Sequence, residues 1–175
     1  MSSYGSTGSK WVLAMSLSEV SNILWRERQL LELLVFKLEE EQLVLAAGRN
    51  KWLSHATREV ETVLDEIKRV ELQRSVAVSG LGREMELSDS PSLRELSEIA
   101  PAPWDGIFNE HRRALLELAQ EIDSVAKANR DVLQRGQQAA REALVSIGEI
   151  DIEAYDASGA ITDRTLALRL VDEAI

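Results

Sequence analysis

Cysteine is absent from this chain of 175 residues, and aromatic side chains make up only 5% of it. Without cysteine, the chain forms no disulfides, thiol nucleophiles or cysteine-ligated zinc sites. Only three prolines and nine glycines interrupt it, and its abundant Leu, Ala, Glu and Arg favour long helices over strands. The length suffices for one domain with its own core. We therefore expect a single all-α architecture.

Positive charge is also scarce. The 20 Lys and Arg residues stand against 30 Asp and Glu residues, which gives a net charge of -10. Such a surface repels phosphate backbones, so nucleic acid is not expected as a partner. The longest apolar run near the start, Trp11 to Met15, is too short for a signal peptide and far too short to span a bilayer. We expect a cytoplasmic protein without membrane insertion.

The usual catalytic motifs are missing as well. No P-loop, dinucleotide-binding, nucleophile-elbow or zincin pattern occurs, and neither His55 nor His111 follows a Glu at the spacing of a di-iron bundle. We expect no cofactor, no metal and no enzymatic activity. His111 lies on an apolar stripe, which predicts a hydrogen-bonded core histidine.

His55 offers the sharpest enzymatic alternative. It lies near the start of an amphipathic helix, as the acceptor histidine of kinase dimerisation domains does. The residues that follow, Ala56 to Val60, lack the acidic residue and the proline of that signature. We interpret His55 as a surface histidine and keep a phosphotransfer domain as a minor alternative.

A first long helix is predicted from the capping-box pattern Ser16-x-x-Glu19 to Gly48. Residues 1–15 are rich in Ser and Gly, so we expect a disordered lead-in, with Met15 as an alternative start of translation. Two adjacent apolar stripes indicate that this helix is covered on two sides and is central in a bundle. The acidic run Glu39-Glu40-Glu41 is interpreted as solvated.

A second helix follows the Gly48-Arg49-Asn50 turn, with apolar heptad positions through Ala77, and forms an antiparallel hairpin with the first. The pattern breaks over residues 79–92. A short helix capped by Ser90-Pro91 is predicted to reach Ile99 before Pro101 and Pro103 stop it.

A third long helix follows from Trp104. The helical domain is therefore assigned to residues 16–148. We expect residues 149–175, with seven acidic and two basic residues, to form a flexible acidic tail. A weak amphipathic pattern that begins at Thr162 suggests a short helix within this tail. We expect part of the third helix to extend beyond the hairpin, because the hairpin is too short to cover it.

The apolar stripe of the third helix shifts near Asn129, from Val132 to Leu133, and then continues through Ala140, Leu144 and Ile147. Asn129 occupies a heptad core position, where it either fixes the register or recognises a partner helix. The apolar residues after it either face the core or form a groove for another amphipathic helix. The sequence leaves both alternatives open.

Three segments together resemble the FlgN family of flagellar type III export chaperones. The first helix, from Leu24-Trp25-Arg26-Glu27-Arg28 through Lys37-Leu38-Glu39-Glu40-Glu41-Gln42-Leu43, is similar to the first helix of the family. Asn129-Arg130-Asp131-Val132-Leu133, with Gln137 and Ala143-Leu144, is similar to its third-helix pattern, and Tyr155 to Gly159 to its tail motif. The resemblance covers roughly residues 15 to 160.

This resemblance implies a cytoplasmic chaperone that binds C-terminal helices of the hook-filament junction proteins of FlgK and FlgL type. It implies delivery of this cargo to the export gate at the inner face of the membrane. The implied cargo site comprises Asn129, Val132, Leu133, Gln137, Ala140, Leu144 and Ile147. Tyr155, with Gly159, is implied to dock on the gate subunit FlhA.

A scaffolding coiled-coil protein remains the main alternative function. Its helices would assemble with copies of themselves, and its mark would be a heptad seam left open on the surface. The sequence also leaves a homodimer open for the chaperone itself.

Overall fold

The computed structural model describes residues 5–147, with side chains from Lys10 to Leu144. It contains four helices in this range and no strand: α1 (Gly5–Ala46), α2 (Asn50–Glu84), α3 (Leu93–Ile99) and α4 (Trp104–Ile147). The all-α prediction and the order of three long helices and one short helix are confirmed. None of the described helices combines the length and apolar character needed to cross a bilayer.

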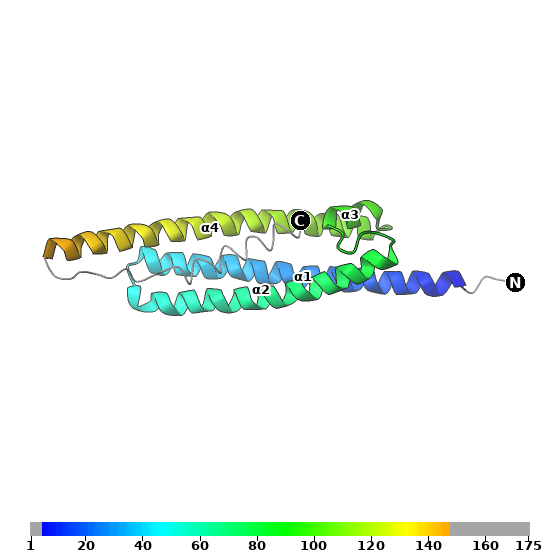
Figure 1. Ribbon diagram of the computed structural model, residues 1–175, viewed down its shortest axis with the longest axis horizontal. Helices are drawn as coiled ribbons and strands as arrows, with labels where there is room; N and C mark the ends of the chain where they lie inside the picture. Colours follow the sequence, from blue (N-terminus) through cyan, green and yellow to red (C-terminus); the bar gives the residue numbers. More distant parts are fainter. Residues whose placement is uncertain (1–4, 148–175) are drawn as a thin grey trace.

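Helix α1 is the central element, as the two apolar stripes predicted. It packs on α2 along one side and on α4 along another, while α3 packs on α4. Helices α1 and α2 are antiparallel, since Glu27 of α1 contacts Arg74 of α2 and, further along α1, Glu41 contacts Thr57. Figure 1 shows α1 between the other two long helices.

Helix α4 runs parallel to α1, because partner residues rise together along both helices. Ser21 contacts His111, and further along Leu38 contacts Asn129. The long α2 and the α3 segment carry the chain back to the starting end of the bundle, which allows the parallel pairing (Figure 1). The residues shared between helices are mainly aliphatic; they include Leu24, Leu31, Leu34, Leu38, Val60, Ile67, Leu81, Leu96, Phe108, Leu115 and Ile122.

The start of α1 differs from the prediction. The helix begins at Gly5, so the expected lead-in is wrong for residues 5–15. Ser16, the predicted cap, lies inside the helix, where its hydroxyl donates to Glu84 of α2 at 2.9 Å and lies 3.2 Å from the Val12 carbonyl oxygen. Composition misled here because Leu13, in a segment rich in Ser and Gly, packs against the core.

The end of α1 matches the prediction at Gly48. This glycine has a positive φ of 62°, a conformation that costs side-chain-bearing residues about 1 kcal/mol. The Arg49 amide donates to the Val44 carbonyl and the Gly48 amide to the Leu45 carbonyl, both at 3.1 Å. These two bonds form a Schellman motif, which stops the helix and turns the chain into α2.

Helix α2 runs past the predicted break at residue 79 and ends at Glu84. Val78 and Leu81 are buried in the core, and their burial outweighs the low helix propensity of Gly80 and Gly82. The predicted cap of α3 is also wrong by two residues. Ser92, not Ser90, caps it, and Glu95 completes a capping box.

One buried ion pair links α1 and α2. Arg74 Nε lies 3.2 Å from Glu27 Oε2, close enough for ion pairing although the atoms are not aligned as a hydrogen bond. Burial raises the pKa of Glu27, Arg74 partly offsets this, and Glu71 adds to the increase. Such a pair is a weak source of stability but restricts the register of the hairpin, because displacing either partner leaves a buried charge.

Gly82 and Gly80 provide a matched test of the loop after α2. A Cβ atom at Gly82 would lie 2.6 Å from the Ser88 carbonyl oxygen and 2.9 Å from Pro91 Cδ, whereas one at Gly80 meets nothing within 4 Å. We expect Gly82→Ala to lower the free energy of unfolding by about 1–3 kcal/mol. Gly80→Ala should raise it by about 1 kcal/mol. Urea denaturation measures both, and equal effects would contradict the close packing of this loop.

Candidate functional site at the end of α4

The face of α4 that packs on α1 is a continuous stripe. Phe108, His111, Leu115, Ile122 and Ala126 are buried along it, and Asn129 is the last buried residue of α4 among the side chains described up to Leu144. These residues recur every three or four positions, as expected for one side of a helix. The stripe therefore covers α1 from the α3 end of the bundle to Asn129.

Helix α4 then continues beyond the end of α1. Asn129 lies beside Leu38 and Glu41, and α1 ends five residues after Glu41, at Ala46. Helix α4 continues for eighteen residues after Asn129, to Ile147. The thirteen-residue difference corresponds to about 20 Å of helix at 1.5 Å per residue. Figure 1 shows this end of α4 projecting past the turn between α1 and α2, in agreement with the expected overhang.

Asn129 is fully buried and is held by α1. Its side-chain nitrogen donates to the Leu38 carbonyl at 2.9 Å and to Glu41 Oε2 at 3.1 Å. The other carboxylate oxygen of Glu41 accepts a 2.8 Å hydrogen bond from Thr57 of α2. One carboxylate thus connects all three long helices. With 0% of its surface exposed, Asn129 does not present a side chain to a cargo here, and the register-fixing interpretation agrees with its contacts.

The other predicted site residues lie on or near the continuation of the α1-facing stripe. Val132 and Leu133 are half-buried near the end of α1, and Gln137 and Ala140 are exposed on the projecting part. Leu144 is half-buried; Ile147 belongs to α4, but its side chain lies outside the described part. Leu133, Ala140 and Leu144 share one side of the helix by their spacing. Tyr155 and Gly159 lie outside the described residues.

Glu41 is the residue that the sequence analysis misjudged. It was interpreted as solvated together with Glu39 and Glu40, yet it is 0% exposed. The available signal was positional, because Glu41 lies three residues after Leu38 and four before Leu45, on the apolar stripe. A charged residue at such a position needs polar partners from the neighbouring helices.

Both histidines match their predictions. His111 is buried, and its Nε2 lies 3.1 Å from the Ser21 hydroxyl, while its ring meets the edge of Trp25 with centroids 5.2 Å apart. Burial, with the nearby positive charge of Arg28, lowers the pKa of His111 to about 4. His55 is exposed and contacts Trp52. Within residues 10–144, no group of three His, Cys, Asp or Glu side chains is arranged to hold a metal.

Comparison with protein families matches residues 15–162 to the family described as FlgN protein. The chain belongs to the FlgN family. Searches of curated proteins and of solved structures returned no match. Membership of the FlgN family assigns the chain to flagellar export chaperones in general, a class of binding proteins that is not known for enzymatic activity.

The structural role of Asn129 is testable against an exposed neighbour. We expect Asn129→Ala to lower the free energy of unfolding by about 2–3 kcal/mol, because Glu41 and the Leu38 carbonyl lose their buried donor. Gln137→Ala, an exposed change on the same helix, should shift it by less than about 0.5 kcal/mol. Denaturation in urea, followed by circular dichroism, compares the two variants. An unchanged stability of Asn129→Ala would contradict the register-fixing role.

Proposed function

We propose that the chain is a cytoplasmic chaperone that binds the C-terminal helices of hook-filament junction proteins, of the FlgK and FlgL type, on the projecting end of α4. The observation that carries the proposal is the continuation of the α1-facing stripe beyond the end of α1. Membership of the FlgN family supplies the class of function, and the overhang supplies a helical surface on which a partner helix can lie.

The physical argument rests on the length of the overhang. A helical stretch of about a dozen residues is only marginally stable in water without a packing partner. A cargo helix laid along Leu133, Ala140 and Leu144 would occupy the position that α1 occupies beside Ile122 and Ala126. This mode of binding is a helix in an apolar groove, in which residues three and four apart serve as anchors. Gln137 would lie among them and donate or accept hydrogen bonds.

Asn129 has an indirect role in this proposal. It holds α4 on α1 where the overhang begins, so it positions Val132 and Leu133 without touching the cargo. Its loss would therefore affect cargo binding through the position of the helix rather than through a lost contact.

The cargo site is tested by Leu133→Asp combined with Leu144→Asp. Each apolar side chain buried by a partner contributes roughly 1.5–3 kcal/mol, so we expect the double variant to weaken cargo binding by at least about tenfold. Isothermal titration with a peptide from the C-terminus of a junction protein gives the affinity. Circular dichroism must show that the helices remain folded.

A matched control adds two aspartates to the opposite side of the same overhang. Gln134→Asp with Gln138→Asp changes the charge equally, at exposed positions, and should leave the cargo affinity within about twofold, because surface changes of this kind have small effects. Equal losses in both double variants would indicate a charge effect. Unchanged affinity in both would place the cargo site elsewhere.

Delivery to the export gate is proposed to depend on Tyr155, with Gly159, through docking on FlhA. Tyr155 is an aromatic residue in an acidic segment, flanked by Glu153 and Asp156, and aromatic side chains are frequent anchors in interfaces. We expect Tyr155→Ala to reduce binding to the cytoplasmic domain of the gate subunit and to slow export. Cargo affinity should remain nearly unchanged.

A pull-down with both partners separates the two roles, and Tyr155→Phe serves as the control that keeps the ring. Loss of cargo binding with gate binding intact would contradict the proposed docking role of Tyr155.

A further inference from the structure

Besides the projecting end of α4, the molecule has an exposed surface on α1, on the side of α1 away from α4. Every third or fourth residue from Val12 to Phe36 faces solvent, and we call this row the open seam. Its two ends are apolar: Val12 and Met15 at one end, Leu33 and Phe36 at the other, with Met15 72% exposed. Large apolar side chains in one row on a helix are typical of a surface that another helix covers.

The middle of the open seam is polar. Glu19, Asn22, Arg26 and Gln29 continue the same spacing, and all four are exposed. Read from either end, the seam therefore passes from two apolar residues through polar ones to two apolar residues. This order is symmetric about the point between Asn22 and Arg26.

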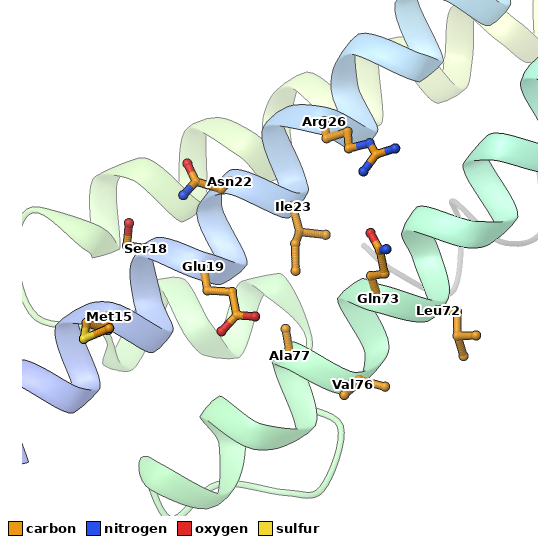
Figure 2. Close-up of a pocket in the computed structure, with 10 residues that line it drawn as sticks. All are labelled: Met15, Ser18, Glu19, Asn22, Ile23, Arg26, Leu72, Gln73, Val76 and Ala77. Carbon is orange, nitrogen blue, oxygen red and sulfur yellow. The ribbon is translucent and has the colours of Figure 1, made fainter.

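A groove runs beside the middle and first part of the open seam. It has a volume of about 920 Å³ and lies between α1 and α2. In Figure 2, Met15 and Arg26 mark the two ends of its α1 side, and Ile23 and Ala77 lie between the helices. On the α2 side, Leu72 and Val76 are both 68% exposed. The groove thus adds apolar surface beside the polar middle of the open seam.

We propose that the open seam pairs with the open seam of a second copy of this chain, with the two α1 helices antiparallel. The symmetric order of side chains is what selects this occupant. A twofold axis between Asn22 and Arg26 places Met15 opposite Leu33 of the second copy, and Val12 opposite Phe36. It also places Glu19 opposite Gln29 of the second copy, and Asn22 opposite Arg26.

Each of these residue pairs joins side chains of similar polarity. Apolar residues meet apolar ones at both ends, and in the middle a carboxylate, two amides and a guanidinium exchange hydrogen bonds. Glu19 also lies within one helical turn of Arg26 of the second copy, where opposite charges attract. A two-helix contact of this kind is isologous, because every contact occurs twice around the axis.

The second copy also reaches the groove. Arg74 contacts Glu27, so in this register Leu72 and Val76 on either side of Arg74 flank the Val20–Leu24 segment of the other α1, which extends the contact beyond a single helix. The paired stretch from Val12 to Phe36 is about 36 Å long at 1.5 Å per residue. A contact based on one helix per copy lies at the small end of specific interfaces. The dimer is therefore concentration-dependent, and it leaves the overhang of α4 accessible.

The absence of cysteine allows a register test with introduced cysteines. Met15→Cys and Leu33→Cys are made as separate proteins and mixed under mild oxidation. The proposal expects disulfide-linked dimers mainly from the mixture, because only this pair brings Cβ atoms within about 4.5 Å. In the control, Leu43→Cys takes the place of Leu33→Cys. Leu43 is also an exposed leucine of α1, but it lies about 15 Å along the helix from Leu33 and so does not face Met15 of the second copy.

Sedimentation velocity over a range of concentrations tests the association itself. The unmodified full-length chain should shift from monomer to dimer as its concentration increases, and Met15→Asp with Leu33→Asp should weaken the dimer by at least about tenfold. A monomer at every concentration overturns the proposal. Cross-linking of Met15→Cys with itself, or equally with Leu43→Cys, overturns the antiparallel register.

If a segment other than a second copy covers the open seam, the experiments give a different result for each such segment. If the cysteine at position 15 becomes protected only when a junction-protein peptide is added, a cargo helix covers the seam and the proposal is wrong. If removal of residues 148–175 turns a monomer into a dimer, the chain's own C-terminal segment covers the seam instead. Neither result affects the cargo site on α4, which the Leu133 and Leu144 variants test separately.

Discussion

The buried carboxylate of Glu41 is the constraint on which the arrangement of the long helices depends. It lies on the core side of α1, where a charge without partners would be strongly unfavourable. Thr57 of α2 and Asn129 of α4 each donate a hydrogen bond to it. A shift of either helix along α1 by one turn, about 5.4 Å, would remove a donor. The register of both helices, and with it the length of α4 that overhangs, follows from this one group.

Two further polar contacts act at other heights of the bundle. Arg74 meets Glu27 between α1 and α2, and His111 meets Ser21 between α1 and α4. Aliphatic side chains alone tolerate sliding, since one leucine layer resembles the next. Polar groups with only one matching partner do not, so they add specificity to the stability that the aliphatic core provides.

Much of this fold could be predicted from the sequence because helices of this length repeat their apolar pattern many times. The central position of α1, the turn at Gly48 and the core position of His111 were all visible in that pattern. The start of α1 and the end of α2 were not. At both places low-propensity residues remain helical because Leu13 packs against the core and Leu81 is buried in it, and such packing depends on elements distant in sequence.

The candidate site was predictable only in part. The apolar residues after Asn129 could be found from their spacing, and the overhang from the lengths of the helices. The position of Glu41 between Leu38 and Leu45 indicated its burial, but its hydrogen bond with Asn129 could not be predicted, because the two residues lie 88 positions apart in the sequence. The open seam on α1 was hidden for a related reason. Its polar centre interrupts the apolar pattern, and its symmetry becomes meaningful only once the exposed side of α1 is known.

The central position of α1 also affects how the molecule opens. Helices α2 and α4 both pack on α1 and make at most a few close contacts with each other. Removing α4 from α1 would therefore leave most of the hairpin contacts intact. The two helix pairs share α1, and their buried side chains belong to one core. Local opening of α4 would break its contacts with Ser21, Leu38 and Glu41 and leave the α1–α2 contacts in place.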